Sequence, residues 1–162
     1  MEKTNVMRIL DQKKIPYIPH TYDPSLVDGI SVALQLGERT ERVFKTLVTA
    51  ANTGNYYVFV IPVDKSLDLK KAAKAVGVKS VAMIRQKELL PLTGYIHGGC
   101  SPVGMKKLFR TVIDETAALF DAIFVSAGKV GFQVALDPKL LAGLTGAEFA
   151  DLTEPEPAGA AI

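Results

Sequence analysis

A single lysine lies inside an apolar, β-prone run, Val43 to Val48 (VFKTLV). Side chains alternate between the two faces of a strand, so Lys45 shares a face with Val43 and Leu47. A buried ammonium group must find a partner, lose its proton or face a water-filled cleft, because an unpaired charge in a low-dielectric interior is strongly unfavourable. The run alone leaves two interpretations open: an edge-strand lysine whose head reaches solvent, and a lysine of a functional cleft.

Two loops of small residues are the other candidates for chemistry. The stretch 98–104 (GGCSPVG) has three glycines and a proline, which favour a tightly turning backbone with exposed amides, and 126–131 (SAGKVG) is similar in composition. Such amides can hold a developing oxyanion or a phosphate, and a nearby lysine can anchor a negative charge of the substrate. Each loop alone is more often only a turn, so it is the combination with Lys45 that indicates a site.

The common catalytic motifs are missing from the sequence. It has no GxSxG elbow, no P-loop and no HExxH pattern, and its two histidines are not spaced as metal ligands. His97 and Cys100 are close in the sequence, but the partners of a Cys/His nucleophile pair normally converge from distant segments. A packed or surface histidine is the favoured interpretation, and we expect no metal and no other cofactor.

Strands and helices must position these residues. Helical spacing and capping residues predict helices over 4–13, 30–37, 68–77, 86–92 and 137–144. Apolar, β-prone runs predict strands over 15–18, 43–48, 56–63, 80–84, 111–113, 122–125 and 132–136. Pro16 confines the first strand to a sheet edge, a turn at 52–55 predicts a hairpin, and Pro91 with Gly94 is expected to end the fourth helix. Strands outnumber helices without regular alternation, which predicts an α+β fold with a mixed or antiparallel sheet.

The length of 162 residues suits one domain with a single sizeable core. After Leu152 the composition turns to Glu, Pro, Ala and Gly, so we expect a domain over 1–152 and a flexible tail over 153–162. Cys100 is the only cysteine, which excludes an internal disulfide and a multi-cysteine metal cage. No signal peptide or membrane-spanning run is recognisable, and a cytoplasmic protein is expected.

The net charge of +2 conceals an asymmetry along the chain. Residues 1–110 hold 17 lysines and arginines against 9 acidic residues, whereas residues 111–162 hold 2 against 8. The basic part has the charge to attract a polyanion such as nucleic acid. Solvated helix faces are the alternative explanation of the same charges.

Three stretches, in this order and at these separations, resemble the YbaK/EbsC family: 43–48 (VFKTLV), 93–107 (TGYIHGGCSPVGMKK) and 124–133 (FVSAGKVGFQ). That family includes bacterial Cys-tRNA(Pro) deacylases and is related to the editing domain inserted in prolyl-tRNA synthetases. The resemblance extends from about residue 5 to residue 151. It implies a compact mixed α/β domain of the α+β class, with a central, mostly antiparallel, barrel-like mixed sheet surrounded by helices.

The resemblance also assigns a catalytic set. Lys45 matches the essential lysine of the family. Gly98, Gly99, Ser101 and Pro102 fit its GxxxP element, whose backbone borders the aminoacyl pocket. These residues are expected to position an ester that links a wrong amino acid to a tRNA.

A substrate-binding set follows from the same resemblance. Tyr22 matches an aromatic residue after the first strand, Thr46 follows the lysine as in the family pattern, and Ser126 and Gly128 match the small-residue loop. Gln133 stands where some members have Asp, and this departure argues against a general base at that position. Its amide can still form a hydrogen bond with the substrate amine or ribose.

The implied activity is hydrolysis in trans of mischarged tRNA, with Cys-tRNA(Pro) as the first candidate. In cysteine-specific members the thiol of the substrate is thought to attack its own ester, which agrees with Cys100 matching no family nucleophile. Two alternatives stay open: a deacylase for Ala-, Ser- or Thr-charged tRNA, and a non-catalytic module that binds tRNA or a synthetase. The expected partners are aminoacyl-tRNA and, as a further candidate, prolyl-tRNA synthetase. A membrane is not among the expected partners, and monomer and weak dimer both stay open.

Overall fold

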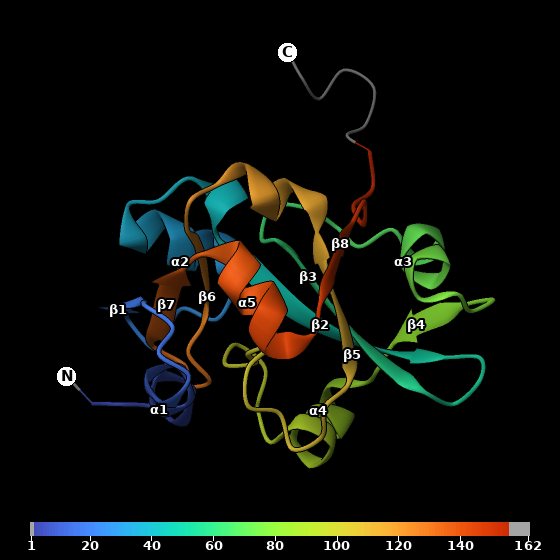
Figure 1. Ribbon diagram of the computed structural model, residues 1–162, viewed down its shortest axis with the longest axis horizontal. Helices are drawn as coiled ribbons and strands as arrows, with labels where there is room; N and C mark the ends of the chain where they lie inside the picture. The colour runs from blue at the N-terminus through green and yellow to red at the C-terminus, as the bar shows by residue number, and fades with distance from the viewer. Residues whose placement is uncertain (1, 156–162) are drawn as a thin grey trace.

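Two β-sheets and the helices packed around them make up residues 2–155, the part of the chain that the computed structural model describes (Figure 1). The α-helices are α1 Asn5–Gln12, α2 Gly29–Leu36, α3 Leu69–Val76, α4 Gln86–Thr93 and α5 Pro138–Thr145, and the short 3₁₀-helices are η1 Thr40–Arg42 and η2 Glu115–Leu119. The strands are β1 Ile18–Thr21, β2 Phe44–Ala51, β3 Tyr56–Pro62, β4 Val81–Met83, β5 Arg110–Asp114, β6 Ile123–Ser126, β7 Phe132–Leu136 and β8 Glu148–Ala150. The predicted α+β class is confirmed.

The larger sheet has the strand order β4-β2-β3-β5-β8. β2 and β3 form the predicted antiparallel hairpin, with Lys45 opposite Ile61. β4 adds to the far half of β2 as an antiparallel strand, at Thr49 to Ala51. β5 and β8 continue the sheet in parallel on the other side of β3. The first half of β2 therefore has only one neighbour, β3, within this sheet.

The smaller sheet has the order β1-β7-β6, and all its pairs are antiparallel. β1 lies at the edge, as predicted, but it begins three residues later than the predicted 15–18, so that it contains Pro19 and not Pro16. The delay has a local cause: Lys14 adopts a left-handed conformation (φ 57°) and the Ile15 amide donates to the Leu10 carbonyl at 2.9 Å. Those residues complete the end of α1 and are not available to a strand.

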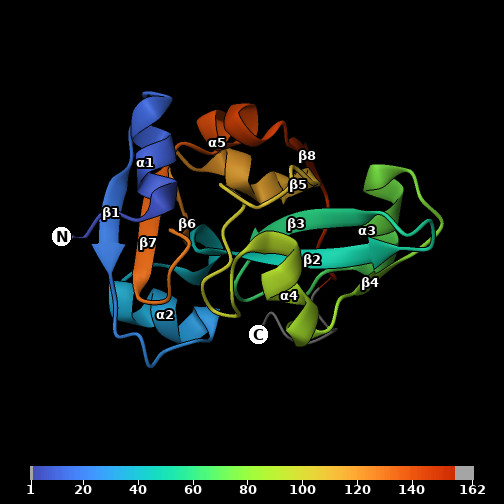
Figure 2. The same cartoon turned by 90° about the horizontal axis from the view of Figure 1, so that it is seen from below.

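The sheet that the family resemblance implies is divided here, and residues 2–155 form no closed barrel. Figure 2 shows the two sheets side by side, with β1, β7 and β6 in one group and β2, β3 and β4 in the other. One isolated parallel bridge, between Val43 and Phe124, joins β2 to β6. η1 ends at Arg42, immediately before this bridge, so the pairing cannot extend backwards along an extended strand.

Apolar side chains fill both faces of the larger sheet. Val60 of β3 packs in a core with α1, α5 and the smaller sheet, while its neighbours Phe59 and Ile61 pack on the other face with α3. Because alternate residues of a strand point to opposite faces, a strand buried on both sides needs a continuous apolar run, which β3 has. A third core joins Ala33 of α2 to Val63 and Phe124.

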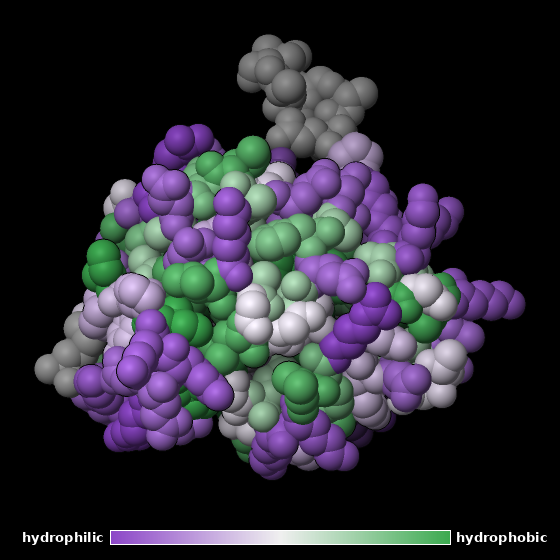
Figure 3. Space-filling model, viewed as in Figure 1, coloured by the Kyte–Doolittle hydropathy of each residue, from purple (hydrophilic) through white to green (hydrophobic). Residues whose placement is uncertain are grey.

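The face drawn in Figure 3 is mainly hydrophilic, with apolar areas beside α5.

Two local details differ from the predictions. The helix predicted over 86–92 continues one residue further, to Thr93, with Pro91 inside it, and it ends at Gly94 as predicted, where φ is 86°. Pro91 has no backbone N–H to donate, yet Leu92 and Thr93 continue the helix beyond it. β8 was not predicted, because Glu148–Ala150 contains a single β-prone residue, Phe149, and no apolar run. None of the helices in the described part of the chain has the length and hydropathy that crossing a membrane requires.

The start of the predicted tail is attached to the fold. Thr153 forms an antiparallel bridge with Leu67, and its carbonyl accepts a hydrogen bond from Lys71 Nζ at 2.8 Å. The Glu154 amide donates to the Ser66 carbonyl at 3.0 Å. Ordered contacts thus pass the expected boundary at residue 153, while 156–162 lie outside the described residues. The division into a domain over 1–152 and a tail stays a prediction.

Candidate active site

A cavity of about 380 Å³ lies beyond the Val43–Phe124 bridge, where β2 and β6 part. It falls within the range of about 300–1,000 Å³ that is usual for small-ligand sites. Its wall combines β2, the start of α2, the loop after α4 and the ends of β6 and β7. Of the predicted site residues, the lining includes Tyr22, Lys45, Thr46, Gly98, Ser126 and Gln133. Side chains from both sheets thus meet at one cavity.

Lys45 is partly buried in the first half of β2, where the strand edge opposite β3 borders the cavity. Its Nζ donates to the Val63 carbonyl at 3.4 Å. Burial lowers the pKa of Lys45 below its ordinary value of 10.5, and attraction by the Asp64 carboxylate offsets part of that shift. An ammonium has three donors, so one carbonyl leaves Lys45 with capacity to bind an anionic or polarised oxygen.

Two buried oxygens at the cavity lack a hydrogen-bond partner among the described residues, Thr46 Oγ1 and Gln133 Oε1. Gln133 is only 6% exposed. Buried polar side-chain atoms are nearly always paired, because an unpaired one loses its hydration without compensation. A ligand that donates hydrogen bonds would satisfy both atoms.

The first glycine-rich loop contributes only part of its length to the cavity. Gly98 lines it with φ 85°, and its carbonyl accepts a hydrogen bond from the Tyr22 hydroxyl at 3.4 Å. Gly99 is turned toward the second loop: its amide donates to the Ile96 carbonyl at 3.0 Å, and a Cβ there would lie 3.1 Å from the Val130 nitrogen. Gly99 therefore serves the packing of the two loops.

Ser101 and Pro102 lie away from the cavity. Ser101 is fully buried, and its Oγ accepts a hydrogen bond from the Val103 amide at 3.2 Å. Pro102 lines a separate, smaller cavity of about 190 Å³. The structure does not bring these two residues to Lys45, and a direct role in catalysis for them finds no support in the geometry.

The second loop is divided in the same way. Ser126 lines the cavity, and its Oγ accepts a hydrogen bond from the Gly128 amide at 3.1 Å. Gly128 itself is outside the lining. Its φ is 87°, and a Cβ would lie 2.9 Å from both Tyr95 Cε1 and Val6 Cγ2. The close approach of Tyr95 and Val6, together with the positive φ, is by itself a reason for glycine at 128.

Cys100 and His97 also line the cavity. Burial raises the pKa of the Cys100 thiol to about 12, and a hydrogen bond with Thr93 offsets only part of that rise. The thiol is thus protonated at neutral pH, and a thiol is a much weaker nucleophile than a thiolate. Among residues 2–155, no group of three His, Cys, Asp or Glu side chains is placed to hold a metal ion.

Sequence reasoning missed the start of α2, where Asp28, Gly29 and Ile30 line the cavity. Asp28 caps the helix by accepting a hydrogen bond from the Ser31 amide at 2.9 Å, and this bond lowers the pKa of its carboxyl group. A Cβ at Gly29 would lie 2.4 Å from Val63 Cγ1, so glycine lets α2 approach the residue whose carbonyl holds Lys45. The Asp-Gly pair signals a helix start, but this long-range contact has no signal in the sequence.

Known proteins match the chain over most of its length. The family model of the aminoacyl-tRNA editing domain matches residues 24–144. A protein from Enterococcus faecalis, named as the Cys-tRNA(Pro)/Cys-tRNA(Cys) deacylase EbsC, is 47% identical over 96% of this chain and 96% of its own. A proline–tRNA ligase from Pelobacter propionicus is 30% identical over 58% of this chain but only 16% of the ligase. A crystal structure described as a trans-editing enzyme for prolyl-tRNA synthetase has a TM-score of 0.81 and 25% identity, covering 96% of this chain and all of that one.

Proposed function

This chain belongs to the aminoacyl-tRNA editing domain family, and on that premise we propose that it deacylates mischarged tRNA in trans, with Cys-tRNA(Pro) as its substrate. The relative named as a Cys-tRNA(Pro)/Cys-tRNA(Cys) deacylase matches nearly end to end, which supports an enzyme that acts as a separate protein. The match to a proline–tRNA ligase covers a small part of that ligase, as an inserted editing domain would.

One observation supports hydrolysis by positioning: the cavity pairs a lysine with unpartnered buried oxygens, and the thiol in its lining, Cys100, is held protonated by burial, which raises its pKa. Such a wall is suited to hold and polarise an ester. The attacking group must then come from the substrate or from water.

In the proposed mechanism Lys45 binds the ester carbonyl or the phosphate of the terminal nucleotide. The backbone at Gly98 borders the same space, and no described residue accepts a hydrogen bond from its amide. Preorganised donors of this kind stabilise the negative charge that develops on the carbonyl oxygen. Thr46 Oγ1 and Gln133 Oε1 accept hydrogen bonds from the substrate, for which the α-amino group and the ribose hydroxyl have suitable donors.

The bond changes of the proposed step are balanced without an enzyme nucleophile. The substrate sulfur attacks its own carbonyl carbon and loses its proton, the ester C–O bond breaks, and the ribose oxygen leaves as a hydroxyl with a proton. The amino acid departs as a cyclic thioester, which water then opens to cysteine. A rigid cavity that holds the thiol in line with the carbonyl accelerates this step, because the reacting atoms are already positioned.

The test is deacylation of Cys-tRNA(Pro), Cys-tRNA(Cys), and Ala- and Ser-charged tRNA(Pro) by the wild-type protein. Faster release from Cys-tRNA(Pro) than from the Ala and Ser esters supports the proposed mechanism, because only cysteine has the attacking thiol. Faster release from the Ala or Ser ester would identify that ester, and not Cys-tRNA(Pro), as the substrate. No turnover of any of them, together with tRNA binding, would favour a non-catalytic binding module.

Prolyl-tRNA synthetase is the proposed source of tRNA selection. The likeness to a structure described as its trans-editing enzyme supports this partner. Repeating the Cys-tRNA(Pro) and Cys-tRNA(Cys) reactions with the synthetase present tests it. We expect the synthetase to increase the preference for tRNA(Pro). An unchanged ratio of the Cys-tRNA(Pro) rate to the Cys-tRNA(Cys) rate would show that the synthetase does not select the tRNA.

A further inference from the structure

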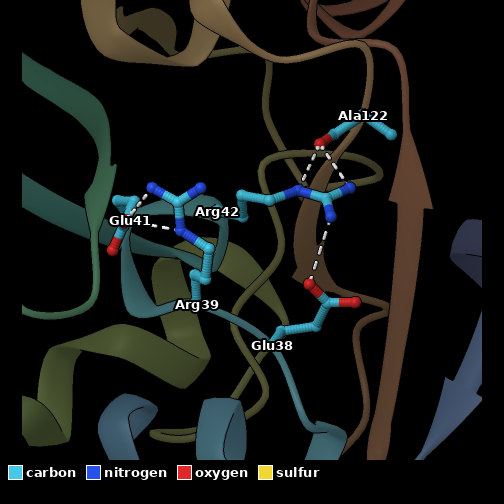
Figure 4. A network of polar contacts seen from close by, with 5 residues as sticks. All are labelled: Glu38, Arg39, Glu41, Arg42 and Ala122. Carbon is cyan, nitrogen blue, oxygen red and sulfur yellow. Dashed lines mark hydrogen bonds and ion pairs between the residues drawn. The ribbon is translucent and has the colours of Figure 1, made fainter.

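Arg42, outside the cavity, joins the two strands that form its wall. Its Nη2 and Nε donate to the Ala122 carbonyl at 3.2 and 3.4 Å, and its Nη1 pairs with Glu38 at 3.2 Å (Figure 4). The guanidinium also lies 5.6 Å from the centroid of the Phe124 ring. Ala122 comes directly before β6, and Arg42 ends η1 two residues before β2, so one side chain ahead of β2 holds the start of β6.

We propose that Arg42 is a positioning residue for the cavity, which sets how far β2 and β6 are separated and hence where Lys45 lies relative to Ser126. The proposal rests on the deacylase function proposed above. Arg42 itself is not among the cavity-lining residues, so any role it has in turnover must be indirect.

Backbone pairing contributes little to fixing the separation of β2 and β6. Val43, the residue before β2, and Phe124 of β6 form the only backbone bridge between these two segments within residues 2–155. In the parallel register of that bridge, Lys45 and Ser126 are each two residues further along, and both line the cavity. Lys45 comes three residues after Arg42, so it lies within about 10 Å of Arg42 along the chain. A displacement of the chain at the bridge is therefore expected to move Lys45 as well.

The chemistry of arginine suits this contact. Its planar guanidinium gives two donors to one carbonyl while a third pairs with a carboxylate, and its flat face stacks on an aromatic ring. Phe124 is 3% exposed and is held on another side by the His20 ring, at 5.0 Å between centroids. Lysine at 42 would carry all its donors on a single nitrogen, without the planar fork, so it should hold β6 less firmly.

A matched control lies three residues away. Arg39 also carries a guanidinium on this segment, and Figure 4 shows it paired with Glu41 instead of β6. The Arg39 and Glu41 side chains are 72% and 42% exposed. Arg39→Met therefore removes the same charge from the same segment without touching the contact between the strands. Glu38→Gln removes the ion pair of Arg42 but leaves both bonds to Ala122.

The experiment compares Arg42→Met, Arg42→Lys, Arg39→Met and Glu38→Gln by two readouts. The first is kcat and KM on Cys-tRNA(Pro). The second is the titration of Lys45, followed by ¹³C NMR of the reductively methylated protein, with the resonance assigned by its loss in Lys45→Met. The second readout needs no substrate, so it judges Arg42 even if the proposed function fails.

We expect Arg42→Met to lower kcat by about 10- to 100-fold with little change in KM, because misplacement of a positioned group slows the reaction itself. The Lys45 pKa should rise back toward 10.5 as the cavity opens to water. Arg42→Lys should recover part of the kcat and part of the Lys45 pKa shift. The controls Arg39→Met and Glu38→Gln should match the wild type in both. If Arg42→Met does not fold, Arg42→Lys is judged by the same readouts.

Three results would overturn the proposal. One is wild-type kcat and Lys45 titration in a folded Arg42 variant. Another is an equal loss in Arg39→Met, which would assign the effect to charge. The third is a lower melting temperature with kcat and the Lys45 pKa unchanged, which would make Arg42 a purely structural residue.

Discussion

Thr46 and Gln133 come from different sheets, yet each places a buried oxygen without a hydrogen-bond partner at the same cavity. Within residues 2–155 they are the two buried side-chain atoms in that condition. Two such atoms at one place indicate a ligand that donates to both, because each unpaired group destabilises the unliganded fold.

Gln133→Leu should weaken substrate binding without lowering the stability of the fold. We expect KM to rise about tenfold, the equivalent of one hydrogen bond of about 1.4 kcal/mol. The melting temperature should stay equal or rise, because an unpaired buried amide oxygen is replaced by an apolar group of similar size. Steady-state kinetics and thermal unfolding measure the two. An unchanged KM with a lower melting temperature would show that Gln133 has only a packing role.

Lys45→Met should abolish most activity and stabilise the fold. Loss of a preorganised donor lowers kcat/KM by about 10²- to 10³-fold. The pKa of Lys45 is lower in the folded chain than in the unfolded chain, so the unfolded chain binds that proton more tightly and the charge destabilises the fold at neutral pH. Full activity in this variant would end the proposed mechanism.

The stability gain of Lys45→Met should depend on pH. It is complete below the folded pKa of Lys45, where the lysine is charged in both states. It shrinks as the pH rises toward 10.5, because the lysine then loses its charge. Chemical unfolding of both proteins at pH 7 and pH 10 measures the difference, and a gain that grows with pH would contradict the assignment.

Cys100→Ala should keep most of the activity. The pKa of the thiol, raised to about 12 by burial, leaves almost no thiolate at neutral pH. For the same reason iodoacetamide should label the folded wild type slowly at pH 8 and the unfolded chain quickly. A folded but inactive Cys100→Ala, with rapid labelling of the wild type, would make Cys100 the nucleophile.

Gly128→Ala should destabilise the fold by about 1–3 kcal/mol, through strain at φ 87° and overlap with Tyr95 and Val6. Gly143→Ala is the matched control: it lies inside α5, no atom lies within 4 Å of a Cβ there, and alanine should stabilise the helix by about 0.5–1 kcal/mol. Urea unfolding measures both. Equal stability of the two variants would remove the packing role assigned to Gly128.

The C-terminal boundary can be tested by two truncations. A chain ending at residue 155 retains the bonds of Thr153 and Glu154 to Lys71 and Ser66, whereas a chain ending at 152 loses them. We expect only the shorter chain to melt at a lower temperature, with deacylation unchanged in both. Equal melting temperatures would return the boundary to residue 153.

Short-range features of the fold were determined by the sequence. Asp68 and Asp137 cap α3 and α5, and Gly77 and Gly146 end them, because caps and left-handed glycines act within one turn of helix. The run 56–63 forms the central strand β3, because its apolar side chains alternate onto two buried faces. The charge of Lys45 in an apolar strand left two interpretations open, an edge-strand lysine and a cleft lysine, and the structure places Lys45 at the cavity.

The tertiary structure decided which residues of the motifs share that cavity. Gly98 and Ser126 line it, while Ser101, Pro102 and Gly128 of the same loops face the protein interior or a second cavity. The approach of Gly29 to Val63 and the hold of Arg42 on Ala122 were also invisible, because each joins segments far apart in the chain. Periodicity and capping report the local environment of a residue, whereas these contacts depend on how two sheets pack and where they part.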